Sequence, residues 1–153
     1  MSILSDSLPI KDIELHLRAT DHRDALEEML SHLRSDPRVK DWEKLRSSLI
    51  ANSERETFKE CPGAMFLHHG RTESVSTLVL AVGRSSVGIS AASIKKKTHL
   101  IFIAAIPEAM NNEYLRILGA ISRVCREEEC VKALLEAKSA SVFLRLLEEG
   151  CRQ

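Results

Sequence analysis

Residues 99–106, His-Leu-Ile-Phe-Ile-Ala-Ala-Ile, are the most continuously apolar stretch of the chain, and Pro107 ends it. Branched and aromatic side chains favour extended backbone. A run that is apolar at nearly every position is typical of a central strand covered on both faces. The run is also far too short to cross a bilayer. The sequence therefore predicts a sheet between layers of helices and no membrane insertion.

Strands and helices are both predicted around this run. Alternation or continuous apolarity predicts strands at residues 13–17, 64–69, 75–82 and 87–90. Apolar residues at helical spacing predict helices at residues 21–33, 40–51, 108–126, 130–135 and 139–149. The remaining segments are predicted to be an extended lead-in at residues 1–10, a loop at 52–63, a turn at 83–86 and a basic loop at 93–98. This pattern indicates one α/β domain over residues 1–153, with a mixed sheet flanked by helices.

The composition restricts the function. Lys and Arg together number 22, as do Asp and Glu, so the chain has no net charge to attract nucleic acid. The first residues lack a basic stretch before an apolar segment, so no signal peptide is predicted. Cys61, Cys125, Cys130 and Cys151 form no CxxC pair, which predicts neither a zinc site nor a disulfide framework. We expect reduced thiols and a cytoplasmic protein.

The chemically suggestive stretch is His68-His69-Gly70-Arg71. Imidazole can transfer protons or phosphoryl groups near neutral pH. Glycine permits close approach of another group, and arginine binds planar arrays of anionic oxygens. Before context is considered, a pair of histidines at a strand end is more often structural than reactive.

The order and spacing of the elements resemble the type 2 IIA domain of the bacterial phosphotransferase system, which includes fructose, mannitol and nitrogen-regulatory members. The resemblance covers residues 8–150, and its best segments are residues 17–26, 69–72, 98–106 and 133–147. It implies a three-layer α/β/α fold.

In that family, the histidine before Gly-Lys or Gly-Arg accepts a phosphoryl group from the phosphocarrier protein HPr. The resemblance assigns this role to His69 rather than His68. It assigns supporting roles to the upstream Arg55 and to Tyr114, which stands where the family has a second active-site histidine. Arg71 would stabilise the transition state electrostatically. No metal or cofactor is implied.

Two functions remain open at this stage, beside an unrelated α/β domain in which the histidine pair is structural. The first is a stand-alone, nitrogen-regulatory phosphocarrier that accepts a phosphoryl group from an HPr-like protein and controls a kinase or transporter. The second is a degenerate IIA-like module that docks partner proteins without efficient phosphotransfer. Tyr114 and the bulky residues 58–62, where the family has small ones, favour the second function.

Overall fold

The structure is a computed structural model that describes residues 3–55, 65–92 and 94–150, without the side chains of Glu54, Arg55 and Ile94. Its sheet has the order β1-β3-β4-β2. These strands are β1 (Ile13–Glu14), β2 (Met65–Arg71), β3 (Val79–Ala91) and β4 (Ile94–Ile106). The central strands β3 and β4 are antiparallel, whereas β1 pairs with β3, and β2 with β4, in parallel. The sheet is therefore mixed, with β2 at one edge.

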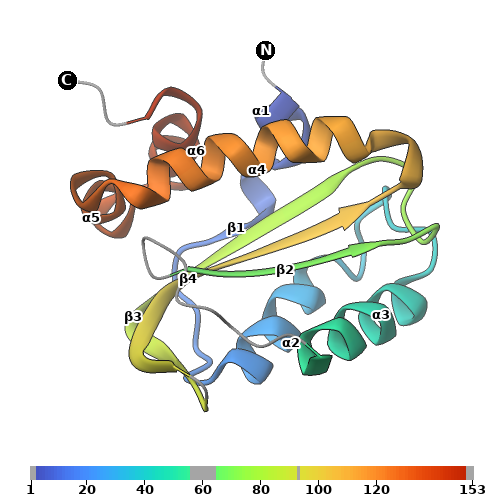
Figure 1. Ribbon diagram of the computed structural model, residues 1–153, viewed down its shortest axis with the longest axis horizontal. Helices are drawn as coiled ribbons and strands as arrows, with labels where there is room; N and C mark the ends of the chain where they lie inside the picture. Colours follow the sequence, from blue (N-terminus) through green and yellow to red (C-terminus); the bar gives the residue numbers. More distant parts are fainter. Residues whose placement is uncertain (1–2, 56–64, 93, 151–153) are drawn as a thin grey trace.

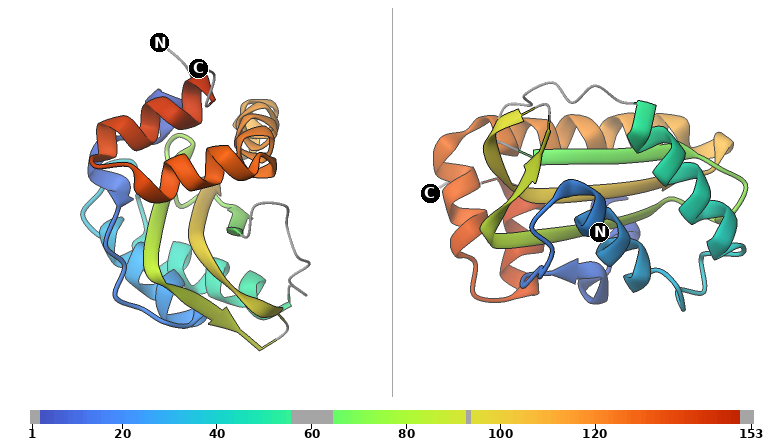
Figure 2. Two further views of the ribbon diagram at one scale, coloured as in Figure 1. Left: turned by 90° about the vertical axis from the view of Figure 1, so that its left-hand side faces the viewer. Right: turned by 90° about the horizontal axis from the view of Figure 1, so that it is seen from below.

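Helices cover both faces of this sheet (Figures 1 and 2). On one face lie α1 (Ile3–Ser7), α4 (Asn111–Arg126), α5 (Glu128–Glu136) and α6 (Ala140–Glu149). On the other face lie α2 (His22–His32) and α3 (Trp42–Arg55). Two short 3-10 turns, Ile10–Asp12 and Glu108–Met110, precede β1 and α4. The predicted α/β fold with a mixed sheet between helices is confirmed.

The central strand β4 explains why the sheet needs two layers of helices. Its residues alternate between two apolar clusters. Phe102 and Ala104 join the cluster beneath α4, whereas Ile101 and Ile103 join the cluster beneath α2 and α3. All four side chains are fully buried. The apolar run at residues 99–106 therefore occupies the position that its composition predicts.

The hairpin strands β3 and β4 are longer than predicted, the strand predicted at residues 13–17 is shorter because β1 covers only Ile13–Glu14, and the lead-in is more helical. The predicted turn at residues 83–86 and residues 94–98 of the loop predicted at 93–98 are parts of β3 and β4, which form one long hairpin, whereas residue 93 lies outside the described residues. Residues 3–7 are helical, because Pro9 follows this helix rather than lying inside it. Asn52 to Arg55 extend α3 and are not a loop. The rest of that predicted loop, residues 56–63, lies outside the described residues.

Two further features concern the part of the chain that the structure describes. None of the helices in the described part combines the length and apolar character that crossing a membrane requires.

Cys130 is disulfide-bonded, so the prediction of reduced thiols is wrong at this position. The sequence gives no local sign of such a bond, because two sulfur atoms need only meet in space.

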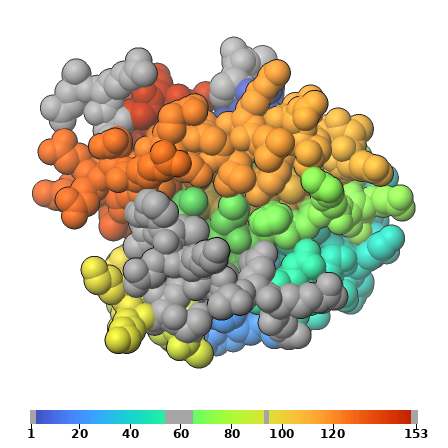
Figure 3. All heavy atoms as spheres, in the orientation of Figure 1, coloured from blue at the N-terminus to red at the C-terminus, as the bar shows by residue number. Residues whose placement is uncertain are grey.

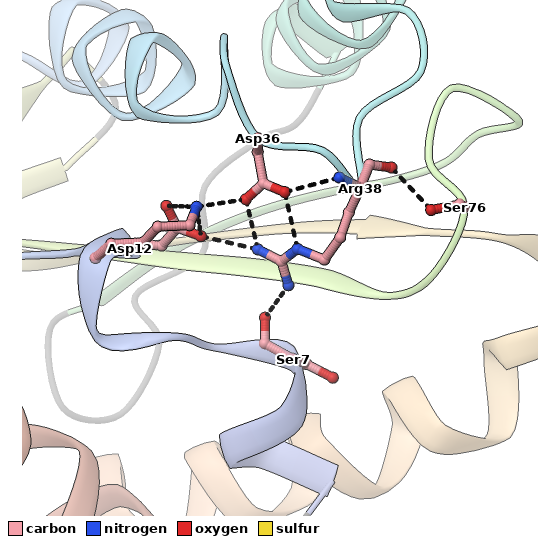
Figure 4. A network of polar contacts seen from close by, with 6 residues as sticks. Ser7, Asp12, Asp36, Arg38 and Ser76 are labelled. Carbon is pink, nitrogen blue, oxygen red and sulfur yellow. Dashed lines mark hydrogen bonds and ion pairs between the residues drawn. The ribbon is translucent and has the colours of Figure 1, made fainter.

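A polar network ties the N-terminal segment to the turn after α2 (Figure 4). The Arg38 guanidinium donates to the carboxylates of Asp36 and Asp12, with its Nη2 atom 2.7 and 2.8 Å from their oxygens. It also donates to the carbonyl oxygen of Ser7 at 2.9 Å. The Lys11 ammonium contacts both carboxylates from the solvent side. Since Asp12 and Asp36 are almost fully buried, each carboxylate depends on these cations.

Candidate functional site

The candidate site lies on the edge strand β2, whose residues alternate between the two faces of the sheet. Phe66 and His68 face α2 and α3, and their rings stack with centroids 6.3 Å apart. Leu67 packs into the cluster beneath α4, and His69 contacts Tyr114 of that helix. The two adjacent histidines therefore point to opposite faces of the sheet, as successive residues of a strand do.

His69 is exposed, whereas His68 is buried. The His69 ring lies against the Tyr114 ring, with centroids 5.8 Å apart and planes inclined by 32°. Figure 3 shows atoms of β2, in green, at the surface between α4 in orange and α3 in teal. An exposed imidazole at a sheet edge is accessible to another protein, and this argues against a purely structural role for His69.

An open cavity of about 540 Å³ lies beside the His69 ring. Its lining combines a few polar groups with an apolar wall: Asn52, Leu67, His69, Gly70, Arg71, Ile106, Asn111, Tyr114, Leu115 and Leu118. Leu115 is 55% exposed, which is unusual among the large apolar side chains of the described residues. The lining resembles that of a ligand-binding cleft, in which apolar side chains surround a small number of polar groups.

Two asparagines from different helices hold the end of β2. The Asn52 side chain of α3 donates from Nδ2 to the carbonyl oxygen of His69 at 3.3 Å. The Asn111 side chain of α4 accepts from Arg71 Nη2 at 2.9 Å. Gly70 permits the first contact, because a Cβ at that position would lie 3.1 Å from Asn52 Nδ2. Glycine thus lets α3 approach the strand beside His69.

His68 has the opposite environment. Burial lowers its pKa to about 4, with smaller effects from the nearby imidazoles of His22 and His69. Its ring lies 6.1 Å from the His22 ring, between α2 and the sheet. A buried, neutral imidazole on this face cannot reach a group bound beside His69.

The structure brings three of the predicted site residues together. His69, Arg71 and Tyr114 line the same cavity. The Tyr114 ring lies against His69, and its hydroxyl oxygen is buried. Arg55 is the last residue of α3, and its side chain lies outside the described part of the structure.

Asn52 and Asn111 were not predicted from the sequence. Each acts through a hydrogen bond to a residue far away in the chain, and neither belongs to a local motif. Only the packing of α3 and α4 beside β2 reveals them.

The fold and the site together indicate the class of protein to which the chain belongs. A single α/β domain presents one exposed histidine, followed by Gly-Arg, on an edge strand beside a cavity. The chain belongs to the family described as "Phosphoenolpyruvate-dependent sugar phosphotransferase system, EIIA 2", whose model matches residues 6–150.

The sequence identity between this chain and individual relatives is low. The chain is 25% identical over 147 residues to the fructose-specific EIIABC component of Bacillus subtilis, covering 95% of this chain but 23% of that protein. It is 28% identical over 147 residues to the fructose-specific EIIA component of Haloferax volcanii, covering 95% of both proteins. Its fold is similar to that of nitrogen regulatory protein IIA-Ntr from Neisseria meningitidis, with a TM-score of 0.82 at 20% identity and coverage of 95% and 99%.

Proposed function

We propose that this chain is a phosphocarrier or phosphorylation-controlled regulatory protein that accepts a phosphoryl group on His69 from an HPr-like protein. The observation that carries the proposal is the exposed His69 imidazole, followed by Gly-Arg, beside an open cavity on the edge strand. Family membership supplies the chemistry, and the exposure of the ring supplies access. Such a protein would work in the cytoplasm as one domain over residues 1–153.

The reaction requires a neutral nitrogen on His69. The lone pair of that nitrogen forms a P–N bond as the P–N bond to the donor imidazole breaks, and the donor nitrogen keeps the released electron pair. Overall, the phosphoryl group moves to His69 and one proton moves to the donor. No oxidation or reduction occurs.

Stabilisation of the transferred group is electrostatic. Negative charge spreads over the three equatorial oxygens in the transition state, so nearby fixed donors lower the barrier. We assign this role to Arg71 and, following the family resemblance, to Arg55. The first turn of α4, which carries Tyr114, adds the positive end of a helix of 16 residues.

The direct test is phosphorylation in a purified system. The chain is incubated with phosphoenolpyruvate, the general kinase of the system and HPr, and its intact mass is measured. We expect one added phosphoryl group that is labile in acid, and its loss in His69→Ala. His16→Ala, which removes another exposed histidine, serves as the control and should still accept the group. Phosphate retained in His69→Ala would refute the assignment.

The branch of the system is also a proposal. The fold likeness to IIA-Ntr motivates a nitrogen-regulatory role that controls a kinase or transporter, whereas the fructose-specific relatives motivate a role in sugar transport. Phosphotransfer from the loaded chain to a fructose-specific IIB protein would favour the second role. A stable phosphorylated chain in the presence of that IIB protein would favour the first.

A second candidate function is a IIA-like docking module without efficient phosphotransfer. Tyr114 favours it, because its hydroxyl oxygen is buried and a tyrosine cannot share the charge change of the second imidazole found in the family. The docking module predicts that a purified partner kinase or transporter binds His69→Ala as tightly as the wild type. Loss of binding in that variant would exclude it.

A further inference from the structure

We propose that Asn111 is a positioning residue that holds the Arg71 guanidinium beside His69. The contact that carries the proposal is the hydrogen bond from Arg71 Nη2 to Asn111 Oδ1, at 2.9 Å. The proposal rests on the proposed function of His69, because the anchored guanidinium serves the phosphoryl group transferred to that residue.

Arg71 needs such an anchor because of where it lies. It is the last residue of an edge strand, two positions after His69, and its side chain is exposed. A long exposed arginine samples many rotamers, and fixing it costs conformational entropy at the moment of transfer. An anchor that is already in place removes that cost from the reaction.

Asn111 is suited to this role. It is the first residue of α4, so its backbone is held by a helix that packs on the sheet. The side chain is short, and its amide oxygen accepts without adding negative charge near a phosphate. The bond uses one of the five N–H groups of the guanidinium and leaves four for a phosphoryl group.

Carboxylates beside Arg71 make the anchor more important. Glu73 and Glu108 border a second hollow of about 360 Å³, which Arg71 and Lys44 also line. An unanchored guanidinium would be attracted towards these carboxylates and away from His69. Asn111 is neutral, and its hydrogen bond to Arg71 holds the charged guanidinium in the cavity beside His69 rather than in the second hollow.

The first test compares Asn111→Leu with Asn112→Leu, a control at the exposed next position of the same helix. The measurement is the single-turnover rate at which phosphorylated HPr loads the chain. We expect Asn111→Leu to load about tenfold more slowly but to the same extent, and the control to stay within about twofold of the wild type. An unchanged rate in Asn111→Leu would overturn the proposal.

A double-mutant cycle separates positioning from a structural role. In an Arg71→Ala background, Asn111→Leu should have no further effect, because its only action is through the guanidinium. A loss of rate that adds to that of Arg71→Ala would mean that Asn111 supports the fold instead, and the proposal would fail.

A spectroscopic measurement does not depend on phosphotransfer. Nitrogen NMR of the Arg71 guanidinium should show restricted rotation in the wild type and in Asn111→Asp, which keeps an acceptor oxygen, but free rotation in Asn111→Leu. Identical Arg71 signals in all three proteins would overturn the proposal. If the wild type accepts no phosphoryl group, the proposed function fails, and the Arg71 spectrum still reports whether Asn111 holds the guanidinium.

Discussion

At the scale of single residues, His68 and His69 show how one step along a strand changes the chemistry of the same side chain. His69 is exposed beside an open cavity, whereas His68 is 1% exposed and stacked between Phe66 and His22. The pleat of the strand causes this difference, because successive side chains point to opposite faces. One imidazole is accessible to a partner, and the other is part of the interior.

The burial of His68 predicts a pH-dependent stability. Its folded pKa of about 4 lies below the value of about 6.5 in an unfolded chain. Between these values the unfolded chain binds a proton that the folded chain does not. The free energy of unfolding should therefore fall as the pH decreases from about 6.5 to about 4, by roughly 3 kcal/mol in total. Urea denaturation at a series of pH values measures this slope.

Two variants test whether His68 causes this pH dependence of the free energy of unfolding. His68→Phe should flatten the dependence, leaving a smaller contribution from His22, whose pKa is also lowered by burial. His69→Ala removes the exposed neighbour and should keep the slope of the wild type. A steep slope that survives in His68→Phe would show that another group is responsible.

At the scale of elements, the sequence predicted the apolar strand core but not the length of the hairpin. Gly83-Arg-Ser-Ser has the composition of a turn, yet all four residues continue β3. Lys95, Lys96 and Lys97 suggest a loop, yet they are exposed residues of β4. Pairing between the two strands overrides local preference here, because each strand supplies the backbone partners of the other.

The sequence predicts those parts of the candidate site whose residues are adjacent in the chain. His69, Gly70 and Arg71 are adjacent in the sequence, so their chemistry could be read together. Tyr114 followed from the family resemblance. Asn52 and Asn111 could not be found this way, since their partners lie 17 and 40 positions away.

The contact between β3 and α2 predicts a sensitive glycine. A Cβ at Gly83 would lie 2.6 Å from Leu17 Cδ1 and 2.8 Å from Met29 Sδ. Gly83→Ala should therefore overpack this layer and lower the free energy of unfolding by about 1–3 kcal/mol. Thermal or urea denaturation measures the change.

Gly119 in α4 provides the matched control. Among the described residues, a Cβ there would meet only Arg123 Nη1, at 3.7 Å. Gly119→Ala should be neutral or stabilise the chain by up to about 1 kcal/mol, because alanine favours helix. Equal losses in the two variants would contradict the overpacking argument.

At the scale of the whole molecule, the Arg38 network connects the start of the chain to the layer formed by α2 and α3. Hydrogen bonds from the Arg38 guanidinium hold the pKa of Asp36 far below its usual range. Burial raises the pKa of Asp12. Two buried carboxylates therefore share one guanidinium, with Lys11 at the surface.

Removing the Arg38 guanidinium alone should lower the free energy of unfolding more than removing it together with both carboxylates. Arg38→Met leaves two buried carboxylates whose remaining cation is the exposed Lys11 ammonium, and we expect a loss of about 3–5 kcal/mol in the free energy of unfolding. The triple variant Arg38→Met, Asp12→Asn, Asp36→Asn should lose less, because no buried carboxylate charge is left. Urea denaturation of both variants decides this, and a larger loss in the triple variant would contradict the argument.

The position of β4 in the sheet also has a consequence for synthesis on the ribosome. β2 pairs in parallel with β4, whose last residue, Ile106, is translated 35 residues after Arg71. A nascent chain that stops before β4 therefore carries the histidine strand without its neighbour in the sheet. Such stalled chains should be cut readily by protease, and resistance should first appear when β4 and α4 have left the ribosomal tunnel.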